Sequence, residues 1–100
     1  MSWVDRHIER LEAGETVSFR PKGNSMTPLI RSGDLCTVSP VADRQLQRRD
    51  IVLCKVAGNQ YLHLISAIRG DEIQISNNHG RVNGWTSREK IYGVLDRVEP

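Results

Sequence analysis

Apolar residues recur along this chain in two spacings, one helical near the start and one of strand type after it. The helical stripe consists of Val4, Ile8 and Leu11. This spacing predicts a short amphipathic helix over residues 3–13, with Gly14 as its C-terminal stop. Ser2 and Asp5 are typical of a capping-box-like start, with Asp5 in place of the usual Glu or Gln.

After Gly14 the chain consists of short, strand-like apolar blocks separated by turn residues. The expected strands are residues 16–19, 35–38, 51–56, 61–68, 72–76 and 91–98. The turn signals are Ala57-Gly58-Asn59-Gln60, Arg69-Gly70-Asp71 and Asn83-Gly84, and residues 43–46 and 86–89 fit single helical turns. Turn signals at short, even spacing are typical of small all-β structures. The pattern therefore predicts a mainly β fold, a small coiled antiparallel sheet with one short N-terminal helix.

Length and charge narrow the class of protein. One hundred residues favour a single domain with a modest core. Within it we expect an N-terminal helical part at residues 1–14 and a β part at residues 15–100. The net charge of +2 and the scattered basic residues give no stripe for nucleic acid, so we expect no nucleic-acid partner. No apolar run has the length of a membrane span or the form of a signal peptide.

The two cysteines, Cys36 and Cys54, each lie inside an apolar run. Buried free thiols are typical of a reducing compartment, so the sequence favours a cytoplasmic protein, although a single disulfide is the alternative. His7 and His79 fit no metal-ligand spacing with these cysteines. We expect neither a metal nor a cofactor.

The candidate chemistry begins with Ser25, in the loop Gly23-Asn24-Ser25-Met26-Thr27-Pro28. A serine nucleophile needs a hydroxyl on a constrained backbone, with N–H groups nearby for an oxyanion. The Ser25 N–H is the best such donor, with the Asn24 region beside it. The structural alternative is a turn serine that bonds to its own loop.

His63 is the candidate base, because an imidazole with a pKa of about 6.5 transfers protons near neutral pH. Strand alternation places Tyr61, His63 and Ile65 on one face. A strand histidine that simply packs is the structural alternative. Lys55, in the preceding apolar strand, is a rival base.

These segments, taken in order, resemble the catalytic core shared by bacterial signal peptidases and LexA-like self-cleaving repressors. The matching pieces are Gly23-Asn24-Ser25-Met26-Thr27-Pro28, Gly33-Asp34, Arg49-Asp50-Ile51-Val52-Leu53, Tyr61-Leu62-His63-Leu64-Ile65, Arg69-Gly70-Asp71, Ser76-Asn77-Asn78 and Tyr92-Gly93-Val94. They span roughly Val17 to Val98. Most bacterial members carry a lysine where this chain has His63, so the resemblance is to a histidine-type variant without membrane anchor or DNA-binding domain.

The resemblance implies a Ser25–His63 dyad. It implies that Met26 packs beneath the serine loop and that Asn24 lies beside the oxyanion. Asn77 and Asn78 occupy the loop where histidine-type enzymes usually carry an aspartate, which leaves the group that orients His63 open.

The implied activity is that of a small soluble serine endopeptidase, which cleaves an extended peptide with small side chains near the cleaved bond. The alternative is a catalytically inactive, peptidase-like binding or regulatory module, favoured by the missing lysine and carboxylate. Ala13-Gly14 matches the bond type that LexA-like proteins cleave in themselves, but it lies close to Ser25 and fits a helix stop better.

Overall fold

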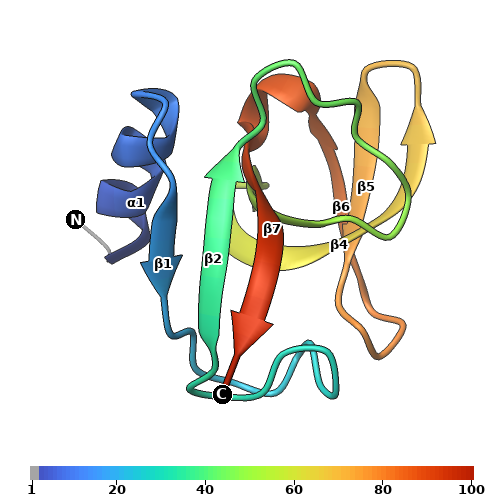
Figure 1. The fold of residues 1–100 in the computed structure, drawn as a ribbon. Coiled ribbons are helices and arrows are strands. Elements are labelled where there is room, and N and C mark those ends of the chain that lie inside the picture. The colour runs from blue at the N-terminus through green and yellow to red at the C-terminus, as the bar shows by residue number, and fades with distance from the viewer. Residues whose placement is uncertain (1–2) are drawn as a thin grey trace.

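The computed structural model describes residues 3–100, which form one antiparallel sheet with a helix beside it (Figure 1). The elements are α1 (Trp3–Glu12), β1 (Val17–Phe19), β2 (Leu35–Pro40), β3 (Ile51–Val56), β4 (Asn59–Arg69), β5 (Glu72–Ser76), β6 (Val82–Ser87), the 3₁₀ turn η1 (Arg88–Lys90) and β7 (Ile91–Glu99). The predicted fold class is confirmed. Ser2, the proposed helix cap, lies outside the described residues.

The seven strands are ordered β1-β2-β7-β3-β4-β5-β6, and every neighbouring pair is antiparallel. The sheet is strongly coiled, so its β6 end returns toward β3. There the Thr86 hydroxyl donates to the Lys55 carbonyl oxygen at 2.7 Å. Coiling of this kind brings side chains of β4 and β6 together although β5 separates these strands.

Helix α1 ends as its sequence predicts. Gly14 has a φ of +87°, which glycine adopts without strain. Its N–H donates to the Leu11 carbonyl at 3.0 Å, and the Glu15 N–H donates to the Arg10 carbonyl at 2.9 Å. This pair of bonds is the Schellman motif of a helix C-terminus.

The two largest clusters of buried apolar residues lie on different parts of the sheet. The larger joins the β-strands and the connection before β3, and its buried members are Leu46, Val52, Cys54, Val56, Ile65, Ile73, Ile75, Ile91 and Val94. The second lies beneath α1, and its buried members are Val4, Ile8, Leu11, Val17, Phe19, Val38 and Leu53. The helix approaches closely because Gly93 has no side chain: a Cβ there would lie 2.6 Å from the Val38 methyl group and 3.0 Å from that of Leu11.

Three local predictions were wrong or displaced. Asn83 and Gly84 are not a turn but part of β6, where a register shift between Ile75 and Ser76 and the Gly84 φ of +140° make an irregular strand. Residues 43–46 form no helical turn, because the chain turns earlier, through an Arg44 N–H bond to the Val41 carbonyl at 2.8 Å. The helical turn expected at residues 86–89 is the 3₁₀ turn η1, which begins later, at Arg88.

The turn of the β3–β4 hairpin is shorter than the four-residue turn expected at residues 57–60. Only Ala57 and Gly58 lie between the strands, with φ values of 49° and 84°. Two positive φ values in a two-residue connection are typical of a type I′ turn, whose twist matches that of paired strands. Asn59 and Gln60 are therefore the first residues of β4, and they fix the register that places His63 opposite Val52.

No helix among residues 3–100 is long and apolar enough to cross a membrane. Cys36 and Cys54 are both buried and free. Burial raises the pKa of the Cys54 thiol to about 12, so this thiol stays protonated and packs as a small apolar side chain.

Candidate functional site

Ser25 lies on the long connection between β1 and β2, which hydrogen bonds between its own residues hold closed. The Gly33 N–H donates to the Pro21 carbonyl at 2.9 Å, and the Gly23 N–H donates to the Ser32 hydroxyl at 3.1 Å. Met26 is only 4 % exposed and packs with other buried side chains: Ile30, Cys36 and Leu64. The residue after the serine thus anchors the loop from beneath.

The Ser25 hydroxyl oxygen lies 3.0 Å from Nε2 of His63, and Nδ1 of the same ring lies 2.7 Å from Oδ1 of Asn83. Both separations are within hydrogen-bonding distance. Since the Asn83 Oδ1 only accepts, the proton of a neutral ring is on Nδ1. Nε2 then has its lone pair directed at the Ser25 hydroxyl, which is the tautomer that a general base requires.

His63 is nearly enclosed, with 8 % of its surface exposed, and its ring stacks on Tyr61 at a centroid distance of 4.8 Å. Burial disfavours the charged imidazolium and lowers the pKa of His63, while the hydrogen bond to Asn83 partly opposes this shift. The ring is therefore held in its neutral, proton-accepting form at neutral pH.

A second segment, residues 77–79, is hydrogen-bonded to the serine loop. The Asn78 N–H donates to the Ser25 carbonyl at 2.9 Å, and its side-chain amide donates to the Thr27 carbonyl at 3.0 Å. Nε2 of His79 lies 3.1 Å from the Asn24 carbonyl. In a trans peptide the N–H and the C=O point in opposite directions. Because the carbonyls of Asn24 and Ser25 point toward residues 77–79, the N–H groups of Ser25 and Met26 point away from that segment.

Asn77 and Asn78 do not reach His63. The Asn77 side-chain oxygen instead accepts the N–H groups of His79 and Arg81 at 2.8 and 3.0 Å. The residue that accepts a hydrogen bond from Nδ1 of His63 is Asn83. The sequence did not point to Asn83 as a site residue, because Asn-Gly is the strongest short signal for a hairpin turn. In the structure this dipeptide lies inside β6, and the coiling of the sheet brings the Asn83 side chain to His63.

Lys55, the rival base, lies on the other side of its strand. Val52 pairs with His63, and residues an odd number of positions apart point to opposite faces. Lys55 therefore faces α1, where it lines a hollow with Asp5, Glu9 and other helix residues. No group of three His, Cys, Asp or Glu within residues 3–100 is arranged to hold a metal ion.

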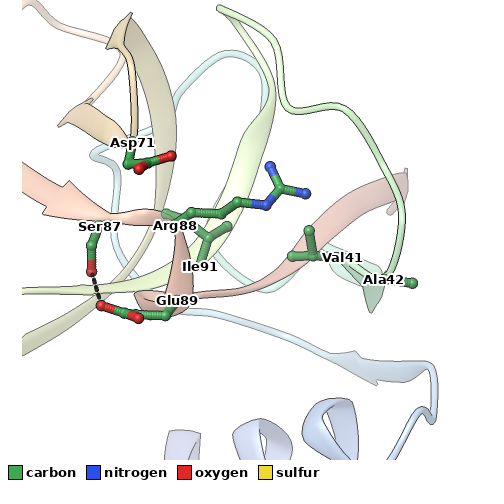
Figure 2. Close-up of a pocket in the computed structure, with 7 residues that line it drawn as sticks. All are labelled: Val41, Ala42, Asp71, Ser87, Arg88, Glu89 and Ile91. Carbon is green, nitrogen blue, oxygen red and sulfur yellow. Dashed lines mark hydrogen bonds between the residues drawn. The ribbon is translucent and has the colours of Figure 1, made fainter.

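The cavity beside the site is small. It has a volume of about 170 Å³, and its lining residues are Val4, Pro21, Lys22, Leu53, Gln60, Tyr61, Leu62 and His63. A larger cavity, about 470 Å³, is elsewhere: it is lined by Val41, Ala42, Asp71, Ser87, Arg88, Glu89 and Ile91 (Figure 2). None of Ser25, His63 and Asn83 lines that larger cavity.

The fold and this cluster define a class: a coiled antiparallel β protein with a serine hydroxyl on a clamped loop, bonded to a buried imidazole. The model of the Peptidase S24-like family matches residues 3–90. The chain belongs to this family, and the match confirms the resemblance to LexA-like and signal-peptidase-like proteins. No curated protein sequence matches the chain.

Proposed function

We propose that the protein is a small serine endopeptidase in which Ser25 is the nucleophile, His63 the general base and Asn83 the group that orients His63. One observation carries the proposal: the continuous hydrogen-bond chain from the Ser25 hydroxyl through both ring nitrogens of His63 to Asn83, at 3.0 and 2.7 Å. Serine, imidazole and an orienting amide or carboxylate are the parts that acyl transfer requires.

In the proposed reaction, the Ser25 oxygen attacks the peptide carbonyl carbon while its proton moves to Nε2 of His63. The carbonyl oxygen becomes an oxyanion, which the N–H groups of Ser25 and Met26 stabilise, since both point away from the 77–79 segment. The imidazolium then gives its proton to the leaving amine as the C–N bond breaks. Water, deprotonated by His63, hydrolyses the resulting ester and restores the Ser25 hydroxyl.

The proposed substrate is an extended segment of a peptide or protein. β1 and β6 are the edges of the sheet, the serine loop follows directly from β1, and Asn83 belongs to β6. A peptide that adds as a strand beside such an edge satisfies its own backbone groups while it presents one bond to Ser25. The compartment we propose is the cytoplasm, in keeping with the free, buried thiols of Cys36 and Cys54.

The second candidate is a binding or regulatory module without turnover. It is favoured by the amide at Asn83, because an amide fixes the tautomer of His63 but stabilises the imidazolium less than a carboxylate does. Such a protein would bind the same extended peptide and release it uncleaved.

The discriminating experiment is reaction with a fluorophosphonate, which labels activated serines, followed by intact mass. We expect one adduct on the wild type, none on Ser25→Ala and a strongly reduced rate for His63→Ala. Ser18→Ala is the matched control, because Ser18 is exposed and its hydroxyl lies 3.1 Å from that of Thr37, away from the Ser25 site. It should label like the wild type.

Two results contradict this assignment. If Lys55→Ala abolishes labelling and His63→Ala does not, the assignment of His63 as the general base is wrong. If the folded wild type is never labelled, the proposed peptidase activity is wrong, and a binding module without turnover explains the protein better.

A further inference from the structure

Two neighbouring hollows share Asp71 and Arg88 and contain no residue of the proposed catalytic site. The larger one, hollow A, is the cavity of about 470 Å³ in Figure 2. The smaller one, hollow B, has a volume of about 220 Å³ and is lined by Leu46, Ile68 and Ile73 as well as by the two shared residues. Because Asp71 and Arg88 line both hollows, a ligand held at these two residues can extend into either one.

The floor of both hollows is apolar and belongs to the larger core cluster. Leu46 and Ile73 in hollow B and Ile91 in hollow A are buried members of that cluster. Ile68 pairs with Ile73 across β4 and β5, so the two side chains share a face, and Ile68 remains 41 % exposed. An apolar cavity of about 150 Å³ is large enough to bind benzene. Hollow B therefore has the size and the walls for one branched or aromatic side chain.

The Arg88 side chain spans the gap between η1 and the connection from β2 to β3. Its Nη2 donates to the Arg44 carbonyl oxygen at 2.6 Å, and Figure 2 shows the side chain extended toward Val41. The Arg44 guanidinium in turn donates to the Ser39 hydroxyl at 2.7 Å and to Asp96 at 2.8 Å. The Arg88 guanidinium is thus held between the two hollows by a bond that uses one of its five N–H groups.

Asp71 supplies the opposite charge. It lines both hollows together with Arg88, yet neither residue belongs to an ion pair within residues 3–100. The other carboxylate of hollow A, that of Glu89, accepts a bond from the Ser87 hydroxyl at 3.1 Å and lies across Arg88 from Asp71 in Figure 2. A ligand with only a negative charge would lie beside the Asp71 carboxylate, and one with only a positive charge beside the Arg88 guanidinium. A zwitterion pairs with both.

We propose that the two hollows form a binding site for a free α-amino acid with a branched apolar or aromatic side chain. The carboxylate of the amino acid binds Arg88, its ammonium group binds Asp71, and its side chain enters hollow B over Leu46 and Ile73. The site does not depend on the proposed peptidase activity, because neither hollow is lined by a residue of the hydrogen-bond chain at Ser25.

The test is a titration of isotopically labelled protein with L-phenylalanine, in which the backbone amide resonances of residues 70–73 and 88–91 are followed. We expect saturable shifts there with a Kd of about 1 mM or below, and none at residues 24–26. N-acetyl-L-phenylalanine lacks the ammonium group, L-phenylalanine amide lacks the carboxylate, and glycine lacks the side chain. Each should bind about threefold or more weakly. Ser25→Ala should bind L-phenylalanine like the wild type, so a failure of the peptidase activity does not affect this result.

Two variants assign the charges. Asp71→Asn should bind L-phenylalanine no more tightly than N-acetyl-L-phenylalanine, and Arg88→Gln should bind it no more tightly than L-phenylalanine amide. Glu72→Gln and Lys90→Gln are the matched controls, because both residues are exposed and close in the chain to the shared pair but line neither hollow. Both controls should bind like the wild type. No saturable shift in the wild type, equal binding of either blocked compound, or unchanged discrimination in Asp71→Asn and Arg88→Gln overturns the site.

Discussion

The imidazole of His63 is held by contacts of three kinds. Its ring stacks on Tyr61, one nitrogen meets the Ser25 hydroxyl and the other meets Asn83. Together these leave the ring one orientation and one tautomer. Pre-organisation of this kind is what a proton transfer needs, because neither the ring nor its proton has to rearrange as charge develops.

The acid limb expected of the proposed activity follows from this burial. A protonated imidazole cannot accept the serine proton, and the folded protein lowers the pKa of His63. The labelling rate of Ser25 is therefore expected to stay constant from pH 8 down to about 6.5 and to fall only below that value. The measurement is the fluorophosphonate rate against pH. A rate that already halves near pH 8 would show a different base.

Asn83→Asp tests the orienting residue. A carboxylate in place of the amide stabilises the imidazolium, so we expect the acid limb to move up by about one pH unit. Asn83→Ala, which removes the acceptor, should slow labelling at every pH. Asn77→Asp is the matched control, since Asn77 lies in the neighbouring segment without contacting His63 and its side-chain oxygen is retained. Its pH profile should coincide with that of the wild type.

At the scale of elements, the helix and the strands were largely predictable, because their periodicities are regular and their ends carry turn residues. β3 and β5 have the predicted bounds, and α1 ends one residue before the predicted limit. Asn83 was not predictable, because local chemistry favours a turn there and only the coiling of the whole sheet makes it a strand residue. The Ser25 loop was recognisable from its motif, whereas its clamp, formed by Asn78 and His79, depends on contacts across about fifty residues.

Helix α1 should contribute to stability without deciding the β fold. It supplies Val4, Ile8 and Leu11 to one cluster, but no residue to the larger cluster between the strands. Three buried aliphatic side chains are worth roughly 5 kcal/mol or more together. We expect a chain that starts near Glu15 to keep a β-type circular dichroism spectrum and to unfold at a clearly lower urea concentration. A spectrum of an unfolded chain in the absence of urea would contradict this.

At the scale of the whole molecule, two histidines connect stability to pH. Burial lowers the pKa of both His7 and His63, and for His7 the charges of Arg10 and Arg6 add to the effect. The unfolded chain therefore binds more protons than the folded one as the pH falls through about 6.5 and on to the lower folded values. The contribution of these rings to stability is then progressively lost.

The urea midpoint is accordingly expected to be lower at pH 5 than at pH 7.5. Replacing each histidine by glutamine should flatten this dependence. The double variant should change least with pH, whatever its absolute stability. An equally steep decrease in the double variant would assign the effect to other groups.

The position of β7 in the sheet has a consequence for the order in which the protein becomes complete on the ribosome. β7 lies between β2 and β3, so it is the strand that joins the β1–β2 part to the part from β3 to β6 (Figure 1). The loop of Ser25 belongs to the first part, and His63 and Asn83 belong to the second. Synthesis proceeds from the N-terminus, so both parts leave the exit tunnel before the strand that joins them. Until β7 is in place, the serine and the imidazole thus lie on pieces of sheet that no strand joins, and the contacts between them are those of loops and side chains, such as the bond from the Asn78 N–H to the Ser25 carbonyl.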